Sequence, residues 1–404
     1  MDFSDTAEEA AYRAKARAWL EANAPRGGLD PGRETGEAME KARLWQAKKA
    51  AAGYAQITWP KEWGGPGGTP IQQVIYSQEE AKYNVTSAHF SIGLGMCVPT
   101  VMAFADEATK QRFVGPALRG DDVWCQLFSE PSGGSDAAAA RTRAVRDGDD
   151  WVVNGQKIWT SGAHYSDYGI LLARTDVDVP KHKGMTMFWL DMKSPGIEVR
   201  PIHQMSGASG FNEVFFTDVR IPDSQRLGPV GDGWKVAIVT LMNERMSIGG
   251  GAGLDYGDFL ELAREVTIDG APALKNQAFR EKLAEWYVQT EGLNYTRLRT
   301  ITALSRGQTP GPENSIGKVV GATVAQELAR EAVEMLDQFG IISDPAVAPM
   351  AARFQGQLLS APGTRIAGGT DEILRNIIAE RVLGLPGDIR VDKDVAFKDM
   401  PTGR

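Results

Sequence analysis

Hydrophobic positions recur at helical spacing near both ends of this 404-residue chain and at strand-like spacing through its middle. Within the first region, residues 1–125, the apolar pattern predicts helices. The expected helices cover residues 4–23, 71–88, 92–105 and Thr109–Leu118, the last closed by Gly120. Residues 59–70, WPKEWGGPGGTP, contain too much glycine and proline for a regular element. The first region is therefore expected to be an α-helical domain with one long loop.

The middle region, residues 126–230, changes its period. Its segment 151–162, WVVNGQKIWTSG, predicts two short strands around Asn154-Gly155, because such a pair suits the positive φ angles of a tight hairpin. Further strands are expected at 184–192, 196–202 and 212–222. Short strands at this close spacing favour a small β-barrel or sandwich.

The third region, residues 231–404, is helical again, and it ends in a charged tail. Long apolar periodicity predicts helices over 277–306, 314–339 and 371–384, and an irregular tail beyond Gly384. Long helices joined by short loops favour an antiparallel bundle.

Composition and charge narrow the class of protein. With 42% hydrophobic and 24% charged residues the chain resembles an ordinary soluble protein, and its net charge of −8 disfavours binding to nucleic acid. We expect no membrane span and no secretory signal, because no apolar run is long enough and the N-terminus lacks a basic start. The two cysteines and four histidines lack the spacing of a disulfide framework or metal site. A cytoplasmic location fits these features best.

Several familiar sites are unsupported by the sequence. It contains no glycine-rich dinucleotide fingerprint after a strand, no phosphate-binding loop of the nucleotide hydrolases and no serine nucleophile elbow.

Two segments of the middle region carry candidate chemistry. Residues 126–136, QLFSEPSGGSD, combine Gly133 and Gly134, which permit close approach of a ligand, with hydroxyls and free backbone N–H groups. The alternative is a polar loop between domains. At 159–161 a tryptophan stands beside two hydroxyl residues, which would suit one face of an isoalloxazine ring. The alternative is an aromatic side chain that only packs in the core.

Together these motifs resemble the acyl-CoA dehydrogenase superfamily. The resemblance rests on SEPSGGSD (129–136) and WVVNGQKIWTSGAHYSDYGILLART (151–175), and it extends to WPKEWGGPG (59–67), residues 95–120 and RIAGGTDEILRNIIAERVLGLP (365–386). It implies an N-terminal α-helical domain, a middle β-domain and a C-terminal four-helix bundle, with FAD between them. It also implies an acyl-CoA substrate, electron-transferring flavoprotein as the electron acceptor, and a homo-oligomer, dimer or tetramer.

The resemblance carries individual flavin contacts with it. It assigns contacts with FAD to Phe128, Ser129, Gly134, Ser135, Trp159, Thr160, Ser161, Thr370 and Glu372, and places Ser135 near the acyl-CoA as well. Thr370 is also expected to cap the helix that follows it.

The catalytic base departs from the usual pattern. In this family a carboxylate removes the α-proton of the thioester while the β-hydride passes to flavin N5. Many members carry that glutamate where this chain has Gly368. A minority, such as isovaleryl-CoA and long-chain acyl-CoA dehydrogenases, carries it on the first helix of the C-terminal bundle. Here LMNERMSIGGGAG (241–253) matches that helix, so we assign Glu244 as the base and Arg245 as a residue on the CoA side. The alternative for Glu244 is a solvated helix residue.

Two further features qualify this interpretation. The run Gly249–Gly251 would either widen the pocket for a branched or bulky acyl group or allow close helix packing. Residues 264–283 lack the Arg-x-x-Phe-Gly segment with which typical members of the family reach a neighbouring subunit's FAD. The loop MLDQFG (335–340) resembles another flavin contact between subunits, and Gln338 is its best candidate. Alternative hypotheses are therefore a non-catalytic, FAD-supporting subunit of a mixed oligomer, and a flavin monooxygenase or oxidase on the same fold.

Overall fold

The computed structural model describes residues 4–26, 28, 36–85, 89–247, 256–268, 270–308, 311–387, 389 and 392–400. It divides into two compact units. The larger unit comprises Ser4–His203, Ser209–Gly249 and Ile389–Arg404, and the smaller one contains Gly250–Asp388. No described helix is long and apolar enough to cross a membrane.

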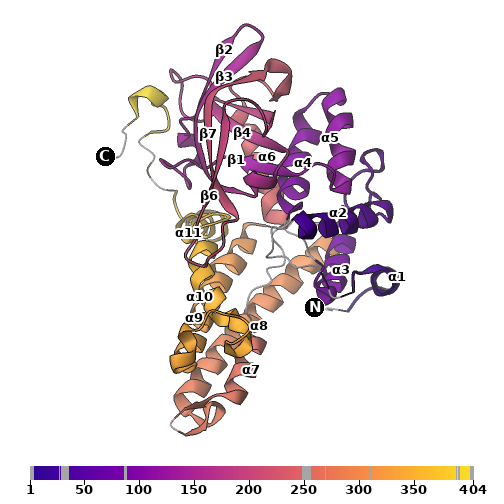
Figure 1. Cartoon of the computed structure of the whole chain (residues 1–404), viewed down its shortest axis with the longest axis vertical. Helices are drawn as coiled ribbons and strands as arrows, with labels where there is room; N and C mark the ends of the chain where they lie inside the picture. The colour runs from indigo at the N-terminus through magenta and orange to yellow at the C-terminus, as the bar shows by residue number, and fades with distance from the viewer. Residues whose placement is uncertain are drawn as a thin grey trace. The chain divides into compact units, whose positions relative to one another are not determined.

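The larger unit begins with the helices that the sequence predicts and one that it does not. They are α1 (Ala7–Asn23), α2 (Gly36–Ala51), α3 (Pro70–Glu80), α4 (Val98–Phe104) and α5 (Glu107–Arg119), as Figure 1 shows in indigo and purple. Helix α2 was not predicted. Helix α3 continues into a 3₁₀ turn, Ala81–Tyr83, and α4 is preceded by a π-helical turn, Gly93–Cys97.

Side-chain caps set the ends of these helices. Thr6 and Thr69 each form a capping box, in which the threonine hydroxyl accepts from a backbone N–H and a side chain three residues later accepts from the threonine N–H. Helix α5 starts at Asp106 and stops at Gly120, whose φ of 82° suits glycine at a helix C-terminus. The predicted end of this helix at Gly120 is therefore confirmed.

A buried glutamate ties α1 to α3. The Glu79 carboxylate lies 3.0 Å from Arg17, 2.7 Å from Lys82 and 3.2 Å from Arg13. Its hydrogen bond with Arg17, helped by Lys82 and Arg13, lowers the pKa of Glu79 from 4.5 to about 2. The native state therefore binds this proton less readily than the unfolded chain does.

We expect Glu79→Gln to lower the free energy of unfolding above pH 4.5 by about 1–2 kcal/mol, allowing for solvent screening of its partners. Because the folded pKa is depressed, the difference from the unmodified protein should shrink as pH falls from 4.5 towards 2. Urea unfolding at a series of pH values measures it. Glu37→Gln removes only an exposed i,i+4 pair with Lys41 and is the control. A pH-independent difference between the Glu79 variant and the unmodified protein would contradict the prediction.

The middle of the larger unit is an eight-stranded sheet. Its order is β6 (Ile197–Ile202), β7 (Phe211–Pro222), β3 (Asp150–Ser161), β2 (Arg143–Asp147), β4 (Tyr168–Arg174), β5 (Met185–Asp191) and β8 (Arg226–Leu227), and β1 (Trp124–Leu127) pairs in parallel with β4. The predicted strands at 184–192, 196–202 and 212–222 are confirmed. Strands β1, β2, β4 and β8 were not predicted.

The predicted hairpin at Asn154-Gly155 was wrong. Residues 150–161 form the single strand β3, and the hairpin turns earlier, where Asp147 lies opposite Asp150. The register of β3 against β7 shifts between Val153 and Gly155, which marks a bulge. Asn154 is used there, because its side-chain amide exchanges hydrogen bonds with Asp218 of β7.

Two hydrophobic cores sandwich β4. Ile170 and Leu172 pack towards the helical core of α1 to α5, whereas Leu171 and Ala173 pack into the core between the strands. Strand β4 is therefore buried on both faces.

Helix α6 (Gly233–Ser247) packs against α4 and β5 of the larger unit. Its buried Thr240 shares a 2.8 Å hydrogen bond with the buried Thr100 of α4. A Cβ at Gly233 would lie only 2.6 Å from Thr186, so glycine allows the start of α6 to lie against β5.

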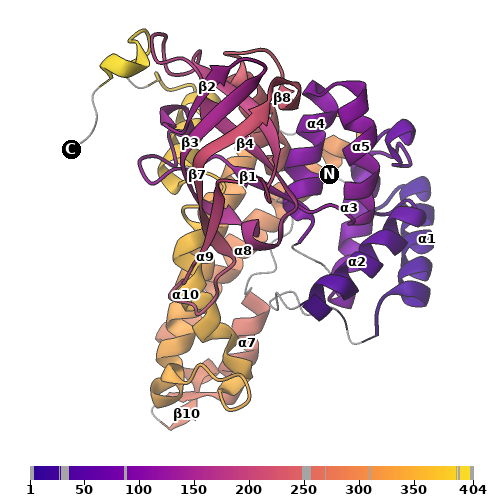
Figure 2. The ribbon, with the colours of Figure 1, turned by 45° about the horizontal axis from the view of Figure 1, so that its top comes forward.

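The smaller unit is a helical bundle with one short hairpin. It contains α7 (Tyr256–Glu265), β9 (Thr267–Ile268), β10 (Ala271–Pro272), α8 (Gln277–Ser305), α9 (Ser315–Met335), α10 (Arg353–Thr364) and α11 (Asp371–Ile377). Helices α8 and α10 each pack along α9 (Figure 2). Phe259, Trp286, Leu328 and Phe354 bring α7 to α10 into one core. The predicted helical bundle is confirmed, with α7 and α10 as unpredicted members. Helix α6, which was expected to be its first helix, belongs to the larger unit instead, because its buried side chains pack against α4 and β5.

Candidate active site

The two candidate flavin segments meet in the larger unit. The Ile158 N–H of β3 donates to the Ser129 carbonyl at 2.9 Å, and the Lys157 ammonium donates to the Phe128 carbonyl at 3.0 Å. Residues 128–130 and 157–158 are thus joined by backbone and side-chain bonds. Residues that are almost 30 positions apart in the sequence are therefore in direct contact.

A buried ion pair locks this junction. Lys157 is fully buried and lies 2.7 Å from the Glu130 carboxylate, which also accepts from the N–H groups of Arg141 and Thr142 at 2.6 and 2.9 Å. Burial alone would raise the pKa of Glu130, but Lys157 and these N–H donors hold it below its usual value. The carboxylate is therefore ionised and fully engaged at neutral pH. Sequence reasoning missed this pair.

The glycine-rich loop that follows is open. Glu130 and Gly133 exchange backbone hydrogen bonds of 3.1 and 3.0 Å, which tighten the turn. Gly134 and Ser135 are exposed, and a Cβ placed on Gly134 would meet no atom within 4 Å. The backbone at Gly134 and Ser135 is therefore exposed and uncrowded.

The end of β3 presents one exposed aromatic ring. Trp159 has a φ of 59°, unusual for a bulky residue, and its side chain is 55% exposed. Its ring makes an edge contact with Phe211 at 6.0 Å. Such backbone strain is of order 1–3 kcal/mol and is concentrated at functional sites.

The neighbouring hydroxyl residues differ in access. Strand alternation turns Thr160 inwards, where its buried hydroxyl has no hydrogen-bond partner among the described residues, while Ser161 stays half-buried. Asn212 donates to the Thr160 carbonyl at 3.0 Å and is itself held by His164 at 3.1 Å. Asn212 of β7 therefore holds the C-terminal end of β3 in place.

The assigned base lies on α6. The backbone of Glu244 and Arg245 belongs to this helix, one turn beyond Thr240, but their side chains lie outside the described part of the chain, as does the run Gly249–Gly251. The Thr100–Thr240 bond anchors α6 just before these residues.

The smaller unit carries the other predicted flavin contacts. Thr370 caps α11 by accepting from the Ile373 N–H at 3.3 Å, which confirms the predicted N-cap. Glu372 lies in the first turn of α11, and Gln338 is exposed in the turn Asp337–Ile341. Lys318 donates to the Gly369 carbonyl and so holds the turn before the cap.

Backbone geometry at the position of the usual base excludes most side chains. Gly368 and Gly369 have φ angles of 66° and 93°, a region that residues with a Cβ rarely adopt. A glutamate at 368 would be strained in this conformation.

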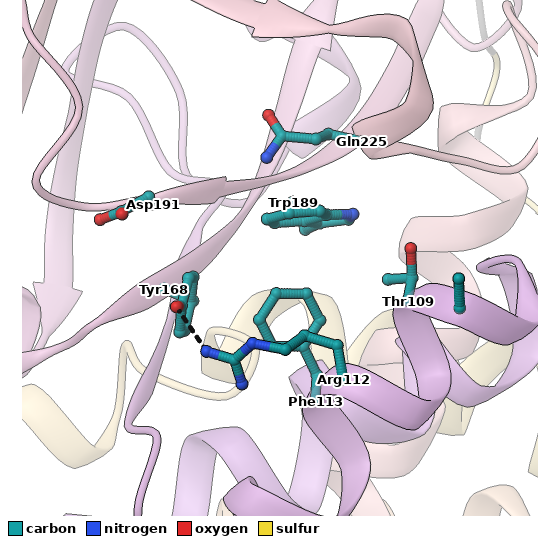
Figure 3. A pocket seen from close by; sticks show the side chains of 8 residues that line it. Thr109, Arg112, Phe113, Tyr168, Trp189, Asp191 and Gln225 are labelled. Atoms are coloured by element: carbon teal, nitrogen blue, oxygen red, sulfur yellow. Dashed lines mark hydrogen bonds between the residues drawn. The ribbon is translucent and has the colours of Figure 1, made fainter.

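A shallow pocket elsewhere in the larger unit lies apart from these residues. Figure 3 shows it between α5 and the strands β4 and β5, with Arg112 over the ring of Phe113 at 4.8 Å and bonded to Tyr168 at 3.0 Å. None of the predicted site residues lines it.

The residues of the larger unit fit FAD. The exposed face of Trp159 suits a flat ring, and the open backbone at Gly134 and Ser135 suits an anionic group. Thr160, the residue after Trp159, has a buried hydroxyl that no described residue contacts by a hydrogen bond.

Comparisons with known proteins identify the family. The N-terminal, middle and C-terminal domains of acyl-CoA dehydrogenase match residues 6–121, 125–219 and 231–383. Acyl-CoA dehydrogenase IpdE1 of Mycobacterium tuberculosis is 35% identical over 390 residues, which cover 94% of this chain and 98% of that protein. Acyl-CoA dehydrogenase FadE34 of the same organism is 37% identical over 84% of this chain, but this chain spans only 46% of its length.

Solved structures show the same fold. The Tcur3481-Tcur3483 steroid ACAD has a TM-score of 0.79 at 27% identity, and covers 96% of this chain and 100% of that one. The ChsE4-ChsE5 complex from Mycobacterium tuberculosis has a TM-score of 0.77 at 27% identity, with the same coverage. The resemblance inferred from the sequence motifs is thus confirmed, and the chain belongs to the acyl-CoA dehydrogenase family of FAD-dependent oxidoreductases that act on CH–CH bonds.

Proposed function

We propose that this chain dehydrogenates an acyl-CoA thioester to the trans-2-enoyl-CoA, with Glu244 as the base that removes the α-proton. The observation that carries the proposal is the junction of residues 128–130 with Lys157 and Ile158, which directly precede Trp159, in the same compact unit as the backbone of α6. The division into domains at 125/126 and 230/231 belongs to the same proposal.

The larger unit would hold FAD through the two joined segments. Lys157, paired with Glu130, holds the Phe128 carbonyl, and the Ile158 N–H holds the Ser129 carbonyl, so this backbone needs no reorganisation when a ligand arrives. The Trp159 ring stacks on the flavin, and Ser161 and the backbone of Thr160 lie along its edge. Ser135 donates to the acyl-CoA. Bound FAD supplies the acceptor for the β-hydride.

The smaller unit would contribute Thr370, Glu372 and Gln338 to the flavin. Thr370 is held in place by its capping bond, and the carbonyl before it is held by Lys318. Gln338 lies in an exposed turn. A residue that contacts the flavin of a neighbouring subunit has to be exposed in this way.

The base belongs on α6 because position 368 offers none. Gly368 has no carboxylate, and its φ of 66° disfavours any residue that has a Cβ, glutamate included. Glu244 follows Thr240 by one turn on a helix anchored at Thr100. A carboxylate in a pocket closed to water gains basicity, which suits removal of a weakly acidic α-proton. Arg245 contacts the CoA side.

The substrate class that we favour is a steroid-like or otherwise bulky acyl-CoA. Support comes from the sequence run Gly249–Gly251, which has no side chains that could fill an acyl pocket, and from similarity to a protein described as a steroid ACAD. We further propose a cytoplasmic homo-oligomer that passes its electrons to an electron-transferring flavoprotein.

Anaerobic addition of a steroid-like acyl-CoA to the FAD-loaded protein is expected to bleach the visible absorption of oxidised flavin. Short straight-chain acyl-CoA should bleach it more slowly, because a small acyl group leaves the pocket unfilled and the reacting carbons poorly oriented. Single-turnover absorbance traces over short, branched, aromatic and steroid-like thioesters measure this order. Bleaching by none of these classes would refute the proposed reaction.

A second candidate is an FAD-supporting subunit of a mixed oligomer. It is favoured by the absence of the Arg-x-x-Phe-Gly segment from residues 264–283 and by similarity to the ChsE4-ChsE5 complex. A preparation of this chain alone with stoichiometric FAD and steady turnover would exclude this candidate.

A further inference from the structure

The C-terminal tail returns to the middle of the larger unit. Ala396 forms a β-bridge with Pro180, the Phe397 N–H donates to the Val179 carbonyl at 2.9 Å, and the Lys398 N–H donates to Val177 at 3.0 Å. Figures 1 and 2 draw the short helix of the tail, Phe397–Asp399, in yellow. The tail, which the sequence predicted to be irregular, is therefore bound to residues 177–180 of the larger unit.

The tail contacts a buried arginine, Arg174, which holds the loop that follows Gly133 and Gly134. Arg174 is 1% exposed and donates to the carbonyls of Ala138 at 2.5 Å, of Ala140 at 3.2 and 3.3 Å, and of Lys181 at 2.6 Å. Burial lowers the pKa of Arg174 to about 10. It nevertheless stays charged at neutral pH, so its charge needs a compensating environment.

The tail supplies part of that environment through an aromatic face. The Arg174 guanidinium lies 3.8 Å from the centre of the Phe397 ring, and Phe397 itself is only 8% exposed. The Arg141 guanidinium lies 5.4 Å from the same ring. A desolvated cation over an aromatic face gains more than an exposed one does.

A second contact joins the tail to the same loop through Lys181. Its ammonium lies 2.6 Å from the Asp136 carboxylate, at the end of the glycine-rich loop, and 2.5 Å from the Asp392 carboxylate of the tail. One cation thus bridges loop and tail, while Arg174 and Phe397 form a separate bridge two to four residues further along the loop.

We infer that Phe397 and Asp392 are positioning residues, which hold residues 136–140 and thereby fix the adjacent Gly134 and Ser135 for the FAD pyrophosphate and the acyl-CoA. This inference rests on the proposed function, because Gly134 and Ser135 are site residues only there. Neither tail residue is catalytic. They act through Arg174 and Lys181, which hold the loop backbone and its last carboxylate.

The following variants distinguish an effect of the aromatic ring of Phe397 from an effect of its apolar burial. Phe397→Leu keeps an apolar side chain but removes the ring, whereas Phe397→Tyr keeps the ring. Lys398→Ala removes an exposed ion pair with Asp178 from the same tail and is the matched control. Amide hydrogen exchange of residues 136–142 in the FAD-free protein, and the dissociation constant for FAD, are measured for each variant.

In Phe397→Leu we expect exchange of these amides to quicken about tenfold and FAD binding to weaken about tenfold, which is the scale of one desolvated cation–π contact. Phe397→Tyr should restore both values, and exchange in the β6–β7 pair should stay unchanged in all variants. Asp392→Asn should give a smaller change in the same direction. If Phe397→Leu matches the unmodified protein and Lys398→Ala in exchange and FAD affinity, the inference is wrong.

These readouts do not depend on turnover. Failure of all acyl-CoA thioesters to bleach the flavin would refute the proposed reaction and would leave the exchange result standing. Normal bleaching together with unchanged exchange in Phe397→Leu would refute the role of the tail alone. With FAD saturating, Phe397→Leu should raise the KM for acyl-CoA and leave kcat within about twofold, because the tail orders a binding loop and not the base.

Discussion

Glu244→Gln is expected to abolish bleaching of the flavin by acyl-CoA while FAD stays bound. An amide has the shape of the carboxylate but cannot accept the α-proton, and loss of a general base lowers a rate by about 10²–10⁴-fold. Stopped-flow absorbance under anaerobic conditions measures the rate of bleaching, and the ratio of flavin to protein absorbance measures retained FAD.

The matched control is Glu107→Gln, the same exchange at an exposed position in the first turn of α5. It should leave the rate unchanged. A Glu244→Gln protein that bleaches at the rate of the control would show that the base is elsewhere. Bleaching that falls only when FAD is also lost would indicate a structural role for Glu244.

Lys157→Met is expected to lower the free energy of unfolding by about 3–5 kcal/mol and to weaken FAD binding. The substitution leaves the Glu130 carboxylate buried without its cation, and it removes the donor to the Phe128 carbonyl. Because Glu130 then ionises less readily, its bonds to the N–H groups of Arg141 and Thr142 weaken as well. Urea unfolding and FAD titration measure the two effects.

Arg200→Met is the matched control, because it breaks the exposed pair between Arg200 and Glu198 and should change stability by less than about 1 kcal/mol. The double variant Glu130→Gln/Lys157→Met should recover part of the stability lost in Lys157→Met, since no buried charge is left unpaired. Equal losses in Lys157→Met and Arg200→Met would refute a special role for the buried pair.

The elements that the sequence predicted well are those with one buried face. Helices α1, α5 and α8 and strand β7 carry a regular apolar periodicity, and their caps and turns lie in the sequence beside them. Strand β4 escaped notice because both of its faces are buried, so GILLA shows no alternation. Asn154-Gly155 misled us because a β-bulge and a hairpin both favour such residues, and only pairing with β7 distinguishes them.

The candidate site divides in a similar way. Family motifs marked Phe128 to Ser135 and Trp159 to Ser161, but their junction depends on partners distant in sequence. Glu130 and Lys157 are 27 residues apart and look like ordinary charged residues until the fold buries both. Strand register decides that Trp159 faces out and Thr160 faces in, and the sequence alone did not specify that register.

The contact between the tail and the β-domain affects how domains of this enzyme can be exchanged with those of its relatives. The family segments end at residue 383, yet Phe397 lies on Arg174 of the middle domain. A chimaera that replaced everything after residue 230 of this chain would keep Arg174 but lose Phe397. An exchange of the C-terminal helices should therefore retain residues 392–400 of this chain together with its β-domain.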